Sequence, residues 1–139
     1  MRSATWPEYF PQGCPPGDAI PAEGLLFRFL RRREPAASDF DDHWTIYPQH
    51  RAAWHANREK HCSVCGLSVY RTLEAAKKKR DILPPLRKMH IASGTVTEPC
   101  GLIAPTPRDQ NDHYTWWPLP SGAHWISVFQ WLEGPVAAT

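Results

Sequence analysis

Fifteen prolines in a chain of 139 residues limit its fold more than any other feature of the sequence. Proline fixes φ and has no backbone N–H, so it interrupts helices and the interiors of sheets. Long helices are therefore excluded, and we expect short elements joined by ordered loops. Residues 1–23 contain five of the prolines together with Trp6, Tyr9 and Phe10. This composition predicts an N-terminal arm over 1–23, packed through its aromatic side chains on a single domain over 24–139.

Short apolar segments separate the remaining prolines, and most of them are typical of strands. Strands are predicted within 24–33, 62–72, 88–96 and 101–107, and the aromatic segments 113–120 and 124–134 are expected to complete the sheet. A helix is predicted at about 72–83, because Thr72 can cap it and Pro84 ends it. A second, short helix is predicted within 49–60. The pattern indicates an α+β domain with a small, mainly antiparallel sheet and one or two short helices.

The balance of charge restricts the classes of partner. Sixteen Lys and Arg against 14 Asp and Glu give a formal net charge of +2. This is too balanced for a protein dedicated to nucleic acid, so specific nucleic-acid recognition is not expected. The basic runs 31–33 and 77–80 are expected to be solvated ends of elements. No apolar run approaches a membrane span, and the N-terminus lacks the apolar core of a signal peptide. We therefore predict a cytoplasmic protein without a membrane partner.

Cys62 and Cys65 have the C-x-x-C spacing with which two thiolates hold one zinc ion. A complete zinc site needs a second ligand pair, and no second C-x-x-C is present. A redox pair would be expected at the start of a helix, whereas the segment after Cys65 is strand-like. The remaining alternative is that the cysteines only fill space at the foot of a strand. Together with Cys14 and Cys100, they are predicted to be free thiols or zinc ligands.

Arg28 is a charged residue inside the apolar segment LLFRFL. Alternation along a strand places Leu26, Arg28 and Leu30 on one face. A charge on an apolar face is costly unless it is paired or faces a cleft. Arg28 is therefore expected to form the floor of a pocket for phosphate or carboxylate. The alternative is an arginine that reaches solvent or pairs with a carboxylate of the following acidic segment, Asp39, Asp41 or Asp42.

Arg28 in the first core strand, followed by Ser68 and Tyr70 in GLSVY before a helix, resembles the plan of ADP-ribosyltransferase-like domains. The resemblance implies that Arg28, Ser68 and Tyr70 hold NAD, with Ser68 and Tyr70 lining the nicotinamide pocket. It also implies a glutamate on a later strand that orients the ribose. Neither E-x-E nor Q-x-E occurs here, so Glu98 is the expected substitute, with Glu133 as the other candidate. Small bacterial domains of this kind often act as toxins or effectors.

The segment NDHYTWWPLP contains a second candidate catalytic residue. His113 can act as a general acid or base if Asp109 or Asp112 orients its ring; the alternative is that it only caps a strand end. The aromatic residues that follow can either stack on a base, a nicotinamide or a sugar, or fill the core. For Trp116 and Trp117 we predict the core.

Two hypotheses about function follow from the sequence. The first is an ADP-ribosyltransferase-like enzyme that binds NAD or another nucleotide and acts on a nucleotide or protein substrate. Its predicted site consists of Arg28, Ser68 and Tyr70 for the cofactor and of His113 and Glu98 for catalysis. The second is a non-enzymatic module that binds a protein partner through a tryptophan-rich surface, stabilised by zinc at Cys62 and Cys65. Both remain open at the level of the sequence.

Overall fold

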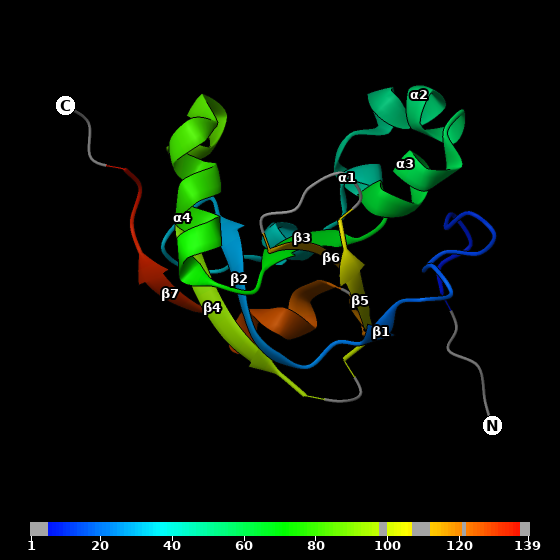
Figure 1. The fold of residues 1–139 in the computed structure, drawn as a ribbon. Helices are drawn as coiled ribbons and strands as arrows, with labels where there is room; N and C mark the ends of the chain where they lie inside the picture. Colours follow the sequence, from blue (N-terminus) through cyan, green and yellow to red (C-terminus); the bar gives the residue numbers. More distant parts are fainter. Residues whose placement is uncertain (1–5, 98–99, 107–111, 121, 137–139) are drawn as a thin grey trace.

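A twisted antiparallel sheet is the framework of the protein (Figure 1). The computed structural model describes residues 6–97, 100–106, 112–120 and 122–136. Within them, seven strands are ordered β1-β5-β6-β3-β2-β4-β7. Their bounds are Ile20–Pro21 (β1), Gly24–Leu30 (β2), Leu67–Tyr70 (β3), His90–Val96 (β4), Leu102–Pro105 (β5), His113–Trp117 (β6) and Gln130–Glu133 (β7). The predicted α+β class with an antiparallel sheet is confirmed.

Short helices connect the strands. The α-helices are His43–Ile46 (α1), Arg51–His55 (α2), Arg58–Val64 (α3) and Leu73–Ile82 (α4), and the 3₁₀ turns are Ala37–Phe40 (η1), Pro48–His50 (η2), Pro84–Leu86 (η3) and Gly122–Ser127 (η4). The helix predicted at 72–83 is confirmed as α4, because the Thr72 hydroxyl accepts a hydrogen bond from the Ala75 N–H at 3.1 Å. The described residues contain more helices than the one or two predicted. None of these helices is long and apolar enough to span a membrane.

The short helix predicted within 49–60 is present as α2, whereas α1 and the second half of α3 are helical where the sequence predicted loop and strand. The side chains of Asp42 and Asn57 cap α1 and α3 by accepting the N–H groups of Thr45 and Lys60. Cys62 therefore lies in α3, and the strand predicted from residue 62 begins only at Leu67. Caps of this kind act over three residues and outweigh the apolar pattern that favoured a strand.

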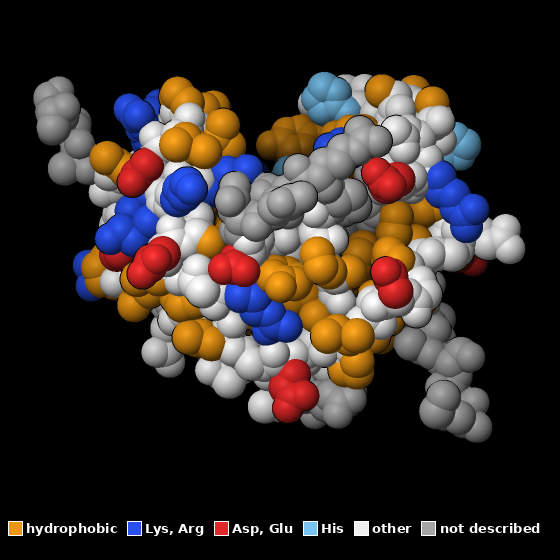
Figure 2. All heavy atoms as spheres, in the orientation of Figure 1, with side chains coloured by type: hydrophobic (Ala, Val, Ile, Leu, Met, Phe, Trp, Pro, Cys, Tyr) orange, Lys and Arg blue, Asp and Glu red, His pale blue; other side chains and the backbone are white. Residues whose placement is uncertain are grey.

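Each face of the sheet is covered by a different layer. Helix α4 lies over one face, where a cluster of Phe27, Tyr70, Ala76 and Ile91 is buried. The other face carries the main core, which includes Leu26, Leu30, Phe40, Trp116, Trp125 and Phe129. Trp116 and Trp117 are 0% and 3% exposed, which confirms the prediction that they fill the core. Lys and Arg side chains gather over α4 (Figure 2).

Of the neighbouring strands in the described part of the sheet, β2 and β3 share the fewest paired residues. In the described chain the register of these two strands contains a single pair, Phe27 opposite Tyr70. By contrast, β2 pairs with β4 along its whole length, from Gly24 to Leu30. The sheet thus has two halves, β1-β5-β6-β3 and β2-β4-β7, that separate on either side of one residue pair. This separation creates room for a pocket.

The described part of the N-terminal arm consists mainly of turns and packs on α1 and α3 through its aromatic side chains. A disulfide joins Cys14 of the arm to Cys62 of α3, with 5.5 Å between their Cα atoms. The Tyr9 hydroxyl donates to the Asp42 carboxylate at 2.5 Å, and a ring nitrogen of His61 lies 2.9 Å from the Tyr9 carbonyl oxygen. The prediction that Cys14 and Cys62 are free thiols or metal ligands is therefore corrected.

Candidate functional site

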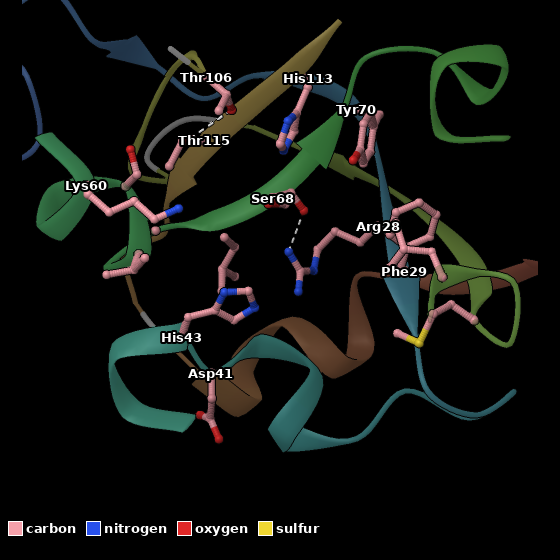
Figure 3. A pocket seen from close by; sticks show the side chains of 16 residues that line it. Arg28, Phe29, Asp41, His43, Lys60, Ser68, Tyr70, Thr106, His113 and Thr115 are labelled. Carbon is pink, nitrogen blue, oxygen red and sulfur yellow. Dashed lines mark hydrogen bonds between the residues drawn. The ribbon is translucent and has the colours of Figure 1, made fainter. Parts of the chain in front are cut away.

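A cavity of about 330 Å³ lies where β2 and β3 separate, between the sheet and the helices α1 and α3. Its walls come from five parts of the chain that are far apart in sequence (Figure 3). Four residues that the sequence predicted for the site line this one cavity: Arg28, Ser68, Tyr70 and His113. The other labelled lining residues are Phe29, Asp41, His43, Lys60, Thr106 and Thr115.

Arg28 is the buried charge of the pocket, with 8% of its surface exposed. Its two terminal nitrogens donate to the backbone carbonyls of Ser68 and Asp39, each at 2.6 Å. Its Nε has no hydrogen-bond partner among the described residues. Burial lowers the pKa of Arg28 to about 10, partly offset by the Asp39 carboxylate, so the guanidinium stays protonated at neutral pH.

This geometry decides between the alternatives for Arg28. Asp39 does contact it, but through its backbone carbonyl, and the Asp39 carboxylate instead accepts N–H groups of Arg31 and Ala36. The guanidinium also lies 5.6 Å from the centre of the Phe40 ring, on the core side. Arg28 therefore spans the gap between β2 and β3, and at the wall of the cavity its terminal nitrogens donate to neutral backbone carbonyls.

The floor of the pocket is built from alternate residues of β3 and β6. Ser68 is opposite Thr115, and Tyr70 is opposite His113. The rings of Tyr70 and His113 are stacked, with 4.8 Å between their centroids and an angle of 14°. Tyr70 is 2% exposed, whereas Ser68 is exposed. The alternation that places Leu67 and Val69 in the core thus turns Ser68 and Tyr70 to the pocket side.

The helical wall was missed by sequence reasoning. His43 on α1 and Lys60 on α3 line the cavity opposite Arg28, and Asp41 precedes α1 at its rim. Partial burial of the imidazole, together with the positive charges of Arg28 and Lys60, lowers the pKa of His43 below its ordinary value of 6.5. No local motif marks these residues, because they reach the pocket only when the segment 41–64 folds back over β3.

Of the predicted acids that the structure describes, neither Glu133 nor Asp112 lines the pocket. Glu98 and Asp109 lie outside the described residues. Glu133, the other glutamate considered for the ribose, accepts a hydrogen bond from Arg80 at 2.7 Å and also lies 3.8 Å from Lys77. It therefore joins β7 to α4 and is not part of the pocket lining. Asp112 directly precedes His113. It has a φ of 54°, and its backbone carbonyl accepts a hydrogen bond from the Arg71 N–H.

The cysteines do not form a pair of thiolates in this structure. Cys62 is bonded to Cys14, while Cys65 is a buried free thiol. Burial, and then the negative charge of Asp42, raises the pKa of Cys65 to about 12, so it is neither a nucleophile nor a ready metal ligand at neutral pH. Among the described residues, no three His, Cys, Asp or Glu side chains gather as a metal site. Zinc at Cys62 and Cys65 would require reduction of the disulfide.

The arrangement is suited to bind an anionic, ring-bearing ligand. It offers a buried cation, a stacked aromatic wall and several hydroxyl groups, including the Thr106 and Thr115 pair at 3.0 Å. No protein-family model, no curated protein and no solved structure matches this chain. The function therefore has to be inferred from the pocket itself.

Proposed function

We propose that this protein is an ADP-ribosyltransferase-like enzyme that binds NAD in the pocket between β2 and β3. The observation that carries the proposal is the convergence of Arg28, Ser68, Tyr70 and His113 on one cavity. The family resemblance assigns the first three to NAD, and their positions in the sequence did not require them to meet. A cavity of about 330 Å³ is at the lower end of ligand pockets and is suited to one half of a dinucleotide.

The residues of the pocket have distinct roles in this proposal. The guanidinium of Arg28 holds a phosphate, because its terminal nitrogens donate only to carbonyl oxygens and the Asp39 carboxylate offsets its buried charge only in part. The His113 ring, supported from behind by the buried Tyr70 ring on which it stacks, provides a flat surface for the nicotinamide ring. The Ser68 hydroxyl is available for the ribose or the amide group, and His113 is the proposed general acid or base. Glu98 remains the proposed acid that orients the ribose.

The biological setting is also a proposal. Small enzymes of this type often act as toxins or effectors in bacteria, as the resemblance implies. The cytoplasmic location predicted from the sequence is in tension with the Cys14–Cys62 disulfide, because disulfides persist mainly in oxidising compartments. We therefore favour a protein that spends part of its life outside the reducing cytosol, as a secreted effector would.

Thermal unfolding with NAD tests the proposal. A ligand present at a hundred times its dissociation constant stabilises the folded state by about 2.7 kcal/mol. We expect about 1 mM NAD to raise the melting temperature and the Arg28→Met variant to lose this shift. Arg32→Met, which removes an exposed arginine just after β2, should keep it. If NAD at that concentration does not shift the wild-type protein, the enzyme hypothesis should be dropped.

The second hypothesis, a zinc-stabilised interaction module with a tryptophan-rich surface, has less support. Trp116, Trp117 and Trp125 are buried in the core, and Trp44 stacks on the His61 ring with centroids 4.0 Å apart. These indoles therefore contribute mainly to packing. Elemental analysis of the purified protein tests the hypothesis, which requires one zinc ion per chain.

A further inference from the structure

We propose that Lys60 and His43 form, together with Arg28, a clamp for a diphosphate group, so that the pocket selects nucleotides with two linked phosphates. The inference rests on the proposed function and deepens it, since it names the part of the ligand that the helical wall recognises. It adds two residues from α3 and α1, neither of which belongs to the motif that carries the family resemblance.

The first support is the position of two cations, Arg28 and Lys60, and of the titratable His43 ring. Arg28 comes from β2, whereas Lys60 and His43 come from the helical wall on the other side of the same cavity. In Figure 3 the Lys60 amine and the His43 ring point into the cavity that Arg28 faces, while the Asp41 carboxylate points away from it. A group with two negative charges would therefore meet positive charge on two opposite sides.

The second support is the cost of leaving these charges without an anion. Arg28 is 8% exposed, its Nε has no hydrogen-bond partner among the described residues, and its other nitrogens meet only carbonyl oxygens. Burial of the ring, together with the positive charges of Arg28 and Lys60, also disfavours protonation of His43, so this part of the cavity has an excess of positive charge. Diphosphate binding would relieve both costs, whereas a neutral ligand would relieve neither.

The third support is that the helical wall is held in place by contacts outside the pocket. Asp42 caps α1 at the Thr45 N–H and accepts the Tyr9 hydroxyl, which fixes the helix that carries His43. The disulfide at Cys62 fixes α3, two residues beyond Lys60. A preorganised wall pays less entropy when the ligand binds.

Titration calorimetry with a graded set of compounds tests the clamp: inorganic pyrophosphate, ADP, NAD, AMP and adenosine. We expect pyrophosphate, ADP and NAD to bind, AMP to bind about tenfold more weakly than ADP, and adenosine more weakly still. Lys60→Met and His43→Gln should each weaken ADP binding, by about tenfold for Lys60→Met. Because Lys60 and His43 are exposed, these variants should fold, and their melting temperatures without ligand check this. Lys78→Met, an exposed lysine on α4 outside the pocket lining, is the matched control.

The outcomes separate the clamp from the proposed function. If NAD binding depends on Arg28 but ADP and NAD bind Lys60→Met and His43→Gln as tightly as wild type, the clamp is wrong and the NAD hypothesis stands. If pyrophosphate and ADP bind in a Lys60-dependent way but NAD does not bind, the clamp stands and the enzyme hypothesis falls. If no phosphate compound binds, or if Lys78→Met weakens binding as much as Lys60→Met, the clamp is overturned.

Discussion

Arg28 is the buried cation of the pocket, and among the described residues no side-chain carboxylate forms an ion pair with it. The sequence placed it on an apolar face, and the structure shows that face at the gap between two strands. A buried cation held only by carbonyl dipoles contributes little net stability, because desolvation offsets the hydrogen bonds. Arg28→Met should therefore change the free energy of unfolding by about 1 kcal/mol or less, even though it removes ligand binding.

Cys65 should resist alkylation while Cys100 reacts. Burial raises the pKa of Cys65 to about 12 and also blocks access, whereas Cys100 is partly exposed. Treatment of the native, oxidised protein with iodoacetamide at about pH 8, followed by peptide mass spectrometry, should show modification at Cys100 alone. In the unfolded, non-reduced protein both thiols should react. Rapid modification of Cys65 in the native protein would contradict its placement in the core.

Binding of NAD should strengthen as the pH falls, and His43 should be responsible. The pKa of His43 lies below 6.5, so the ring gains its positive charge only in mildly acidic solution. The charged groups that act on its ring are Arg28, Lys60, Arg31 and Asp42, and Asp41 lies at the rim of the same cavity. NAD is the suitable probe because its internal diphosphate has no terminal phosphate that titrates near pH 6.

The His43→Gln variant separates this effect from the titration of His113 in the same pocket. The variant should bind NAD with nearly the same affinity between about pH 5 and 7, whereas the wild-type affinity should increase severalfold as the pH falls from about 7 to about 5. An equal pH dependence in both proteins would assign the effect to another group and remove His43 from the clamp.

At the level of elements, the N-terminal arm is attached to α1 and α3 by one covalent bond and several polar and aromatic contacts. The disulfide closes a loop with a sequence separation of 48. The chain-entropy model gives a stabilisation of about 4 kcal/mol for such a loop. A Cys14→Ser, Cys62→Ser double variant should lose most of this in denaturant unfolding. Cys100→Ser, which leaves the disulfide intact, should lose little stability. A double variant with an unchanged free energy of unfolding would show that the disulfide does not restrict the unfolded chain.

The contact between α4 and β7 gives a second prediction at this level. Arg80 is buried and donates hydrogen bonds to the Glu133 carboxylate at 2.7 Å and to the Gly134 carbonyl at 2.8 Å. Glu133→Gln should cost about 2 kcal/mol of stability, because it leaves a buried guanidinium without its counter-charge. The variant should still bind NAD, in contrast to Arg28→Met. Loss of NAD turnover at unchanged stability would instead assign Glu133 to catalysis. Glu34→Gln, at an exposed position between β2 and η1, is the control.

At the level of the whole molecule, the two halves of the sheet meet at one residue pair, and the pocket lies across this junction. A ligand held by Arg28 on β2 and by Ser68 and Lys60 on the other side should couple the halves. Hydrogen exchange should therefore slow at 26–30 and at 67–70 together when ADP or NAD is added. Protection confined to one of these segments would show that the ligand does not bridge the junction. The end of β2 farthest from Arg28, where Gly24 pairs with Val96 of β4, should not change and provides the internal reference.

Much of the fold was accessible from local patterns. The capped helix after Thr72, the strand around Arg28 and the strand with Ser68 and Tyr70 follow from periodicity and caps, which act within a few residues. The short range of these patterns also explains which elements were predicted wrongly. The side-chain caps Asp42 and Asn57 lie in a polar segment where apolar periodicity gives no signal. As a result α1 was missed, the helix predicted within 49–60 was not continued to Val64, and Cys62 was assigned to a strand.

Local patterns were enough to predict the antiparallel α+β class and the face of the strand on which Arg28 lies, because alternation and capping involve only neighbouring residues. The three-dimensional structure was needed to show that Cys62 bonds to Cys14, 48 residues away, and that His43 and Lys60 lie opposite Arg28 (Figure 3). Contacts of this kind depend on strand order and on how the segment 37–64 folds back over β3. That path is set by the burial of the whole core, which no short stretch of sequence encodes.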